Sequence, residues 1–353
     1  MPKKNKIIAI AGNPNCGKTV IFNRLTGSRQ KVGNWAGVTV EQKSGYFSLE
    51  GHDYEIVDLP GTYSLSVIGD NCAIDECIAC NYLITNPPDL VINVVDASNL
   101  ERQLYLTAQL LEMQIPVVVA LNMMDMAKRR GIHIDIAQLS RSLHCPIISL
   151  TAIHGFGIAE LRRALLVIPQ TNSTLPYSFA PLLQGALQTL TEKLAPKNLP
   201  RPWLALRLLE EDRLARHYTS AEELSHVTAL IQQLKNQCGE EIDLLIADAR
   251  YRWIQSILKP SLVVNPQGKT FTSRLDRIVL NRYLGIPIFL LVMYTLFLFA
   301  INVGGAFQDF FDIGSTAIFI QGSIHLLTPL HWPVWLIALI ANGLGKGINT
   351  TIS

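Results

Sequence analysis

One stretch near the N-terminus has the residue types and spacing of a phosphate-binding loop. It matches the pattern G-x-x-x-x-G-K-[ST] and reads Gly12-Asn13-Pro14-Asn15-Cys16-Gly17-Lys18-Thr19. A glycine-rich turn between a strand and a helix points several backbone N–H groups at one spot, where the helix dipole also favours negative charge. We therefore expect Lys18 to reach the β- and γ-phosphates of a nucleotide, and the Thr19 hydroxyl to bind Mg²⁺.

A second motif, Asp58-Leu59-Pro60-Gly61, follows an apolar run at 54–57. A carboxylate at the end of a strand can hold Mg²⁺ through water, and the Gly61 N–H can bond a γ-phosphate that is present only before hydrolysis. The alternative interpretation is a Pro-Gly turn with an aspartate cap.

A third motif, Asn122-Met123-Met124-Asp125, follows the apolar run 117–121. Its carboxylate can accept hydrogen bonds from the N1–H and the 2-amino group of guanine, whereas adenine would offer another acceptor. A buried carboxylate left unpaired costs on the order of 1–3 kcal/mol, so the motif favours GTP over ATP. Met123 stands where this motif usually has lysine, so one packing layer under the base differs.

Residues 151–157 follow the last apolar run and resemble the Ser-Ala loop of GTPases, whose backbone N–H bonds the guanine O6. Thr151 replaces the serine, and Ala152 suffices because the backbone makes the contact. Ras-like enzymes carry glutamine directly after Asp-x-x-Gly to orient the attacking water, but Thr62 occupies that position here. No side chain at 63–71 is an evident base, so we expect slow hydrolysis, as in a switch or timer.

The elements that must position these motifs alternate between short apolar runs and helical stretches. The predicted strands are 7–11, 54–57, 90–95, 117–121 and 146–150, and the predicted helices are 17–26, 74–84, 100–113, 135–143 and 157–168. This pattern predicts a mostly parallel sheet covered by helices on both faces, the α/β fold of a P-loop GTPase, over residues 1–170. A more alternating strand, 40–49, should pair antiparallel with 54–57. Ligands bind such sheets beyond the carboxyl ends of the strands, where the motifs lie.

Strand signals stop after residue 170. Helical periodicity at 181–194, 203–217, 224–234 and 242–257, with a capping box at Ser220 and Glu223, predicts a small all-α domain over 171–265. Its apolar stripes are most simply a core, and the functional alternative is a spacer that transmits the nucleotide state.

The C-terminal part has the composition of a membrane segment. Charged residues make up only 16% of the chain, and 283–303 contains none. A basic linker at 266–282 precedes this span, and residues 261–273 are polar. By the positive-inside rule, the side of the membrane that carries this linker and the domains before it is the cytoplasmic side. We expect the span to end at Gly304-Gly305, an interfacial or re-entrant segment at 304–332 and a partial span at 333–353. One crossing and a partial span cannot form a pore, so we expect a fragment of a longer protein.

The net charge argues against a nucleic-acid-binding protein, and the cysteine spacing argues against an iron–sulfur protein. A formal net charge of +2 provides no electrostatic footprint for nucleic acid. The spacing Cys72-x₄-Cys77-x₂-Cys80 resembles an iron–sulfur site but has no fourth thiolate and falls on a predicted helix, so free thiols are the simpler interpretation.

Several stretches together resemble the FeoB-type ferrous iron transporters of bacteria. They are the phosphate loop, Asn34-Trp35-Ala36-Gly37-Val38-Thr39-Val40, residues 58–65, residues 93–102 and residues 276–281. The likeness covers essentially the whole chain, more weakly over 171–265. It implies that Gly37, Val38, Thr39, Val40 and Glu41 form the first switch, with Thr39 closing on Mg²⁺. It also implies that Asn15 helps to hold K⁺, which neutralises phosphate charge.

The same resemblance implies a GTPase that drives or gates Fe²⁺ uptake across the bacterial inner membrane, with a spacer (GDI-like) helical domain and a multi-pass membrane domain. GTP or GDP, Mg²⁺ and K⁺ are the implied ligands. The membrane, Fe²⁺, small accessory proteins of iron uptake and further copies of the chain are the implied partners. Two alternatives stay open: a soluble or peripheral regulatory GTPase, and a membrane protein whose nucleotide domain only senses.

Overall fold

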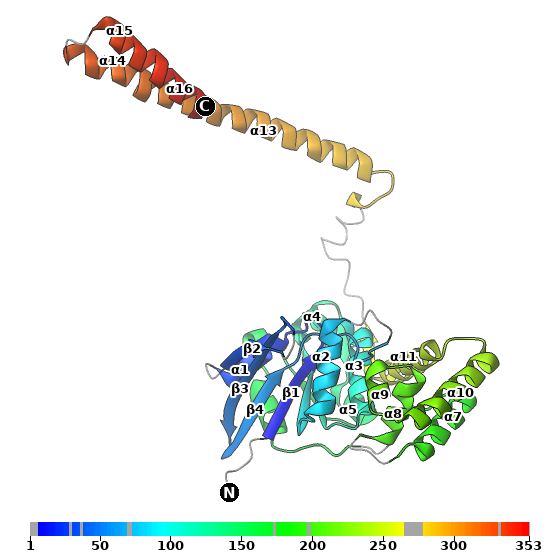
Figure 1. Ribbon diagram of the computed structural model, residues 1–353. Helices are drawn as coiled ribbons and strands as arrows, with labels where there is room; N and C mark the ends of the chain where they lie inside the picture. Colours follow the sequence, from blue (N-terminus) through cyan, green and yellow to red (C-terminus); the bar gives the residue numbers. More distant parts are fainter. Residues whose placement is uncertain are drawn as a thin grey trace. The chain divides into compact units, whose positions relative to one another are not determined.

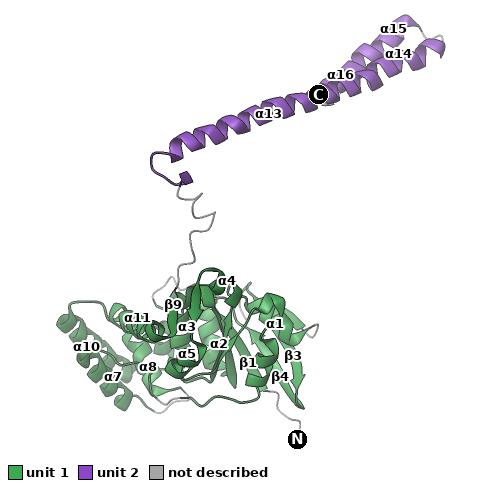
Figure 2. Cartoon of the chain, turned by 180° about the vertical axis from the view of Figure 1, so that it is seen from behind, with its two compact units in different colours: residues 1–267 green, residues 268–353 purple. Residues whose placement is uncertain are grey.

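The computed structural model describes residues 6–27, 30–35, 38–68, 73–171, 174–195, 199–264, 278–330 and 333–352. The chain forms two compact units, residues 1–267 and residues 268–353 (Figure 2).

The first unit is built on a mostly parallel sheet whose order is β2-β3-β4-β1-β5-β6-β8. Figure 1 labels the first four of these strands, β2, β3, β4 and β1. The strands are β1 (Lys6–Gly12), β2 (Gln30–Asn34), β3 (Glu41–Leu49), β4 (His52–Asp58), β5 (Leu90–Asp96), β6 (Val117–Asn122), β7 (Ile132–Ile134), β8 (Ile147–Ser149) and β9 (Leu262–Val264). β1 pairs in parallel with β4 and β5, β5 with β6, and β6 with β8, whereas β2–β3 and β3–β4 are antiparallel. The predicted parallel sheet and its antiparallel strand are thus confirmed.

The helices of this unit follow the predicted alternation through the sheet and continue beyond it. They are α1 (Lys18–Thr26), α2 (Ile74–Thr85), η1 (Ala97–Asn99), α3 (Leu100–Glu112), α4 (Met124–Arg129), α5 (Ile136–Leu143), η2 (Ala152–His154), α6 (Ile158–Ala164), α7 (Pro181–Lys193), α8 (Arg201–Leu209), α9 (Arg213–His217), α10 (Ala221–Cys238) and α11 (Ile242–Ser261). α1 and α6 pack on one face of the sheet, and α2, α3 and α5 pack on the other together with the later helices. Burial on both faces explains why the strands read as continuous apolar runs.

The helical segment agrees with the predicted periodicity except at 203–217. That stretch is two helices, α8 and α9, because the chain turns at Glu211, which has φ +58°, and restarts at the N-cap Asp212. The predicted capping box is present at the start of α10, where the Ser220 side chain and Glu223 bond each other's backbone N–H groups.

A two-stranded ribbon returns the chain from α11 to the sheet domain. β9 pairs antiparallel with β7, with Leu262 opposite Ile134, and the Asp135 N–H donates to the Ser261 carbonyl oxygen at 2.8 Å. The strand at 262–264 was not predicted, because the sequence indicated only the polar stretch 261–273 there. Three-residue strands leave too little alternation to be recognised in sequence.

A buried ionic network joins α3 to the helical segment. The Arg250 guanidinium donates to both carboxylate oxygens of Glu112, at 2.7 and 2.9 Å, and to Glu210. Glu210 in turn accepts from Arg207 at 3.1 Å. All four side chains are at most 2% exposed. Breaking one partner of such a group would leave an uncompensated buried charge, so the helices are held firmly to α3.

The second unit is an apolar helical hairpin. Its helices are α13 (Gly285–Ser315), the π-helix η3 (Thr316–Gln321), α14 (Gly322–Leu327), η4 (Thr328–Leu330), α15 (Val334–Ala338), the π-helix η5 (Leu339–Gly345) and α16 (Lys346–Ile352). Helical structure is continuous over Gly285–Leu330, and the mean hydropathy of its most apolar window is 2.3, which fits a membrane span by length and composition. The described part of 333–353 packs back on α13 and η3.

Helical structure does not stop at Gly304-Gly305, where we expect the span to end, since α13 continues to Ser315 and the expected interfacial segment begins as helix. Glycine weakens a helix in water, but in an apolar surrounding every backbone N–H needs its intrahelical partner, so the helix persists. Asn349 of α16 joins the two arms of the hairpin near the end of α13. It accepts a hydrogen bond from the Ser315 hydroxyl and donates to Asp312 at 2.8 Å.

Candidate functional site

The phosphate loop lies between β1 and α1, where the motif predicted it. Gly17 has φ +96° and Asn15 has φ +63°, so the loop uses left-handed backbone at two positions. A Cβ at Gly17 would lie 2.4 Å from the Asn122 amide nitrogen, which only glycine avoids. The Lys18 ammonium folds back onto the loop and donates to the carbonyl oxygens of Gly12 and Asn13, at 2.9 and 3.3 Å.

The second motif lies directly against this loop. A Cβ at Gly61 would be 2.9 Å from Lys18 Nζ and 3.2 Å from Pro14 Cα, and the Thr62 N–H donates to the Gly12 carbonyl oxygen at 3.3 Å. Asp58 ends β4, and its Oδ1 is buried without a hydrogen-bond partner in the described structure. Burial raises the pKa of Asp58 to about 6, although Lys18 and Lys43 lower it.

The third motif connects the phosphate loop to the loop after β8. The Asn122 amide donates to the Cys16 carbonyl oxygen and accepts from the Ala152 N–H, both at 3.0 Å. Met123 has φ +59° and starts α4, whose first turn carries the half-buried Asp125. The Asn122 side chain therefore fixes the phosphate loop and the loop 151–157 relative to each other.

The loop 151–157 differs in one respect from the expectation for Ala152. Its N–H, which we expect to face the guanine O6, donates to Asn122 in this structure. Thr151 pairs with Phe156 through an isolated bridge, and its N–H donates to the Phe156 carbonyl oxygen at 3.1 Å.

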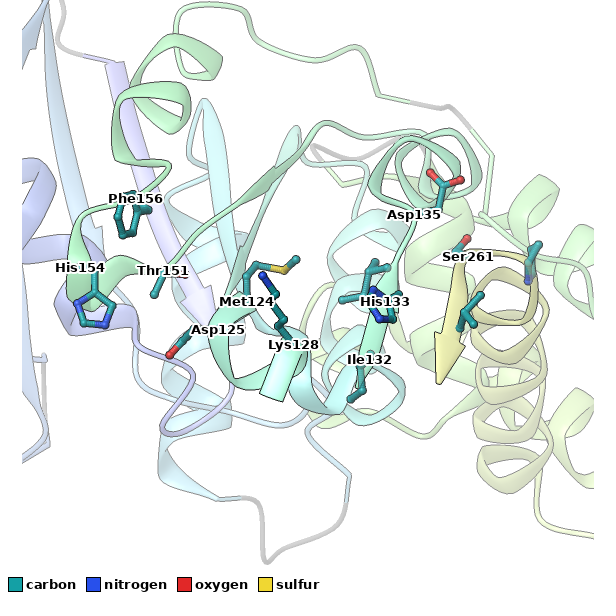
Figure 3. A pocket seen from close by; sticks show the side chains of 13 residues that line it. Met124, Asp125, Lys128, Ile132, His133, Asp135, Thr151, His154, Phe156 and Ser261 are labelled. Atoms are coloured by element: carbon teal, nitrogen blue, oxygen red, sulfur yellow. The ribbon is translucent and has the colours of Figure 1, made fainter. Parts of the chain in front are cut away.

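A cavity of about 760 Å³ opens between this loop, α4 and the β7–β9 ribbon (Figure 3). Asp125, Thr151, His154 and Phe156 line one side. Residues on the ribbon side, including His133, line the other. Asp125 and Thr151, which we predict to contact the base, thus border a space large enough for a purine and its sugar.

The described part of the predicted first switch, 38–41, lies at or near the surface. Thr39 is exposed, Val38 and Val40 are half-buried, Glu41 begins β3, and Gly37 lies outside the described residues. The preceding Trp35 is buried and packs edge-on against Tyr82 of α2, with ring centroids 5.3 Å apart.

The predicted second switch begins with the motif 58–61 and continues over 63–71, and its described part is tied to the helical segment through contacts that sequence reasoning missed. The Val67 N–H donates to Asp212 Oδ2 at 2.9 Å, and the Arg213 N–H donates to the Val67 carbonyl oxygen at 3.0 Å. Arg207 donates to the Ser66 hydroxyl at 2.6 Å. These partners lie far apart in the chain, and no local pattern signals such pairs.

Glu76 of α2 is a further missed residue. Burial raises its pKa, and interactions with the nearby Thr62 and Ser64 partly offset this rise. The carboxylate therefore faces the position that follows Asp-x-x-Gly. An acidic residue in the first turn of a helix was visible in the sequence, but its proximity to Thr62 was not.

The cysteine spacing falls partly outside the described residues, because Cys72 is not among them. Cys80 is a buried free thiol, and burial raises its pKa to about 12. Cys77 is disulfide-bonded, so the expectation of free thiols is wrong for Cys77. Within the described ranges, no group of three or more histidine, cysteine, aspartate or glutamate side chains gathers as a metal site would.

Comparison with known proteins gives consistent matches. The family model for ferrous iron transport protein B matches residues 6–165, and the model for the FeoB cytosolic helical domain matches residues 179–263. The Fe(2+) transporter FeoB of Escherichia coli (strain K12) is 49% identical over 99% of this chain, and that of Salmonella typhimurium is 47% identical. The chain spans 45% of the length of these relatives.

Solved structures match the first part of the chain. The cytosolic domain of L. pneumophila FeoB is 41% identical, has a TM-score of 0.64, and covers 73% of this chain and all of its own. A GDP-bound S. thermophilus FeoB G-domain is 34% identical with a TM-score of 0.66 and the same coverage. The T. maritima FeoB cytosolic domain in its GMPPNP form is 30% identical with a TM-score of 0.60, over 73% of this chain and 99% of its own.

Proposed function

The chain belongs to the FeoB family, and on that premise we propose that it is the GTP-binding part of a transporter that drives or gates Fe²⁺ uptake across the bacterial inner membrane. The observation that carries this proposal is the position of Asn122. Its side chain bonds both the phosphate loop and the base loop, and it stands three residues before Asp125 in the chain. A nucleotide held between these loops would have its phosphates and base fixed by one framework.

In this proposal the phosphate loop, residues 12–19, holds the phosphates, and Asp125 with the Ala152 N–H reads guanine. Because the Ala152 N–H donates to Asn122 in this structure, the base loop has to release or share that donor when guanine binds. The Lys18 ammonium, which now satisfies the carbonyl oxygens of Gly12 and Asn13, is free to turn to the β- and γ-phosphates.

The residues at the end of β4 fit a magnesium ion. Asp58 has a buried Oδ1 without a partner and a raised pKa, so a nearby dication would stabilise its charged form. Thr19, Thr39 and Asp58, the last through water, would hold Mg²⁺, which would neutralise charge on the β- and γ-phosphates. Thr39 is exposed here, so its part requires the first switch to close.

Asn15 would take part in holding K⁺. It is exposed in the left-handed region, so its side chain is available at the surface of the phosphate loop. A monovalent cation beside the phosphates supplies the charge neutralisation that an arginine finger supplies elsewhere.

Slow hydrolysis follows from the surroundings of Thr62. This side chain is too short to orient water as glutamine does, and it is already hydrogen-bonded to the Ser64 carbonyl oxygen. Backbone groups of the second switch would therefore position the attacking water.

The state of the phosphate site can reach the helices through the second switch. Gly61 contacts the phosphate loop, and six residues later Val67 bonds Asp212. Contact of Gly61 with a γ-phosphate would pull on this connection, and the helical segment would pass the displacement to the membrane hairpin and to the metal-conducting helices of the full-length protein.

Asp125→Asn tests the base-reading role by titration of full-length chain with GTP and ATP. We expect the preference for GTP to fall by about 10-fold or more, since the exchange replaces an acceptor by a donor opposite the guanine amino group. Unchanged discrimination would refute the assignment. Iron uptake by the intact transporter in vesicles, with GTP or with a non-hydrolysable analogue, distinguishes a motor from a sensor that only gates.

The soluble regulatory alternative is less well supported. The continuous apolar helix Gly285–Leu330 argues for a membrane, and a net charge of +2 argues against an RNA or ribosome partner.

A further inference from the structure

The tip of the base loop exposes its apolar side chains. Ile153 is 68% exposed and Phe156 is 70% exposed, whereas Ala152 at the base of the loop is buried. Apolar burial therefore does not fix the position of the tip, and hydrogen bonds have to do so.

A side chain of α1 makes one of these hydrogen bonds. Arg24 Nη2 donates to the Ile153 carbonyl oxygen at 2.9 Å. Gly155 lies against the same guanidinium, since a Cβ there would be 3.7 Å from Arg24 Nη1. Arg24 is in the last turn of α1, the helix that begins with Lys18. One helix thus carries the phosphate lysine at its start and a tether to the base loop near its end.

The framework on both sides of the tip is rigid. Gly157 has φ +82°, and a Cβ there would collide with the Ser149 carbonyl oxygen at 2.2 Å, so the exit from the loop is closely packed. Arg162 of α6 donates to the carbonyl oxygens of Arg24 and Leu25, at 3.2 and 3.1 Å, which locks α6 to α1. Between these fixed points, the Arg24 tether acts on the segment that borders the cavity beside Asp125.

We propose that Arg24 is a positioning residue that holds the base loop over the nucleotide and thereby sets the rate of nucleotide release. The role rests on the proposed nucleotide site. Arg24 lies in the last turn of α1 and bonds the base loop at Ile153, so it acts through residues 152–156. Its loss should let the tip open, expose the base edge to water and shorten the bound lifetime, with no direct effect on phosphate chemistry.

Arg24→Ala in the full chain tests this proposal, with release of a fluorescent GDP measured by stopped-flow displacement. Loss of one hydrogen bond to a charged donor should speed release by about three- to tenfold while the association rate stays unchanged. Single-turnover GTP hydrolysis and the melting temperature should stay at the wild-type values. Arg24→Lys, which keeps a donor for the same carbonyl, should restore most of the bound lifetime.

Arg163→Ala is the matched control, because Arg163 is also an exposed arginine and, within the part of the chain that the structure describes, its side chain forms an ion pair with Glu160 of its own helix at 3.3 Å. Release from Arg24→Ala that equals release from wild type or from Arg163→Ala would overturn the proposal. A second pattern would also overturn it. If Arg24→Ala and Arg24→Lys both shorten the bound lifetime of GDP equally and both melt at a lower temperature than wild type, the cause is damage to α1. Failure of the proposed function itself looks different, because the wild-type chain would then bind no fluorescent GDP.

Discussion

Asp212 allows the link between the second switch and the helices to be measured. Its Oδ1 caps α9 by accepting from the Leu214 and Ala215 N–H groups, and its Oδ2 accepts from the Val67 N–H. Asp212→Ala removes the cap, worth about 1 kcal/mol. It also leaves the Val67 N–H buried without a partner, which costs about 1–3 kcal/mol. We expect a total loss of unfolding free energy of about 2–4 kcal/mol.

Asp135→Ala separates the two contributions. Asp135 caps α5 through the Gln138 N–H at 2.9 Å, and within the described ranges of the chain its side chain has no hydrogen bond to a switch residue. Its replacement should therefore cost only the cap, about 1 kcal/mol. Urea unfolding of both variants, followed by near-ultraviolet circular dichroism, gives the difference, and hydrogen exchange at Val67 locates it. Equal midpoint shifts with unchanged slopes, and unchanged exchange at Val67, would show that Asp212 does not hold the second switch.

Three further predictions concern the phosphate loop and the thiols. Lys18→Ala should weaken guanine nucleotide binding by at least about 100-fold, because the loop loses its only phosphate-directed ammonium among the described residues 12–19; calorimetry that still gives micromolar affinity would contradict the assignment. Replacing K⁺ by Na⁺ should slow GTP turnover in wild type but not in Asn15→Ala, and equal sensitivity in both would exclude Asn15 from the cation site. Burial raises the pKa of Cys16 to about 11, so this thiol stays protonated and should resist alkylation at pH 8, whereas the half-buried Cys238 should react first; mass-spectrometric mapping that finds Cys16 labelled first would refute this order.

The sheet domain was predictable because long apolar runs and glycine-rich loops carry strong local signals. The run 90–95 reads as a buried strand by itself, and the phosphate-loop pattern specifies its own strand and helix. β2 gave no such signal, since four of its five residues are exposed and its pattern is set by pairing with β3. The ribbon β7–β9 was missed because its strands are short and lie far apart in the chain.

Parts of the candidate site were likewise predictable from sequence, and other parts were not. The loops around Lys18 and Asp125 follow from motifs, because each motif specifies both chemistry and backbone. Arg207 and Arg250 read as surface residues, yet both are completely buried, and only tertiary packing provides the carboxylates that make this tolerable. Long-range partners of this kind cannot be read from local periodicity.

The β7–β9 ribbon also determines where a pulling force from the chain after residue 264 would act on the nucleotide domain. Any force on the polypeptide leaving Val264 acts first on the pair Ile132–Val264. Ile132 comes two residues after Arg130, the C-cap of the helix whose first turn carries Asp125. Tension applied from outside the domain would thus arrive beside the purine end of the site, whereas the phosphate end communicates with the helices by the separate route through Val67.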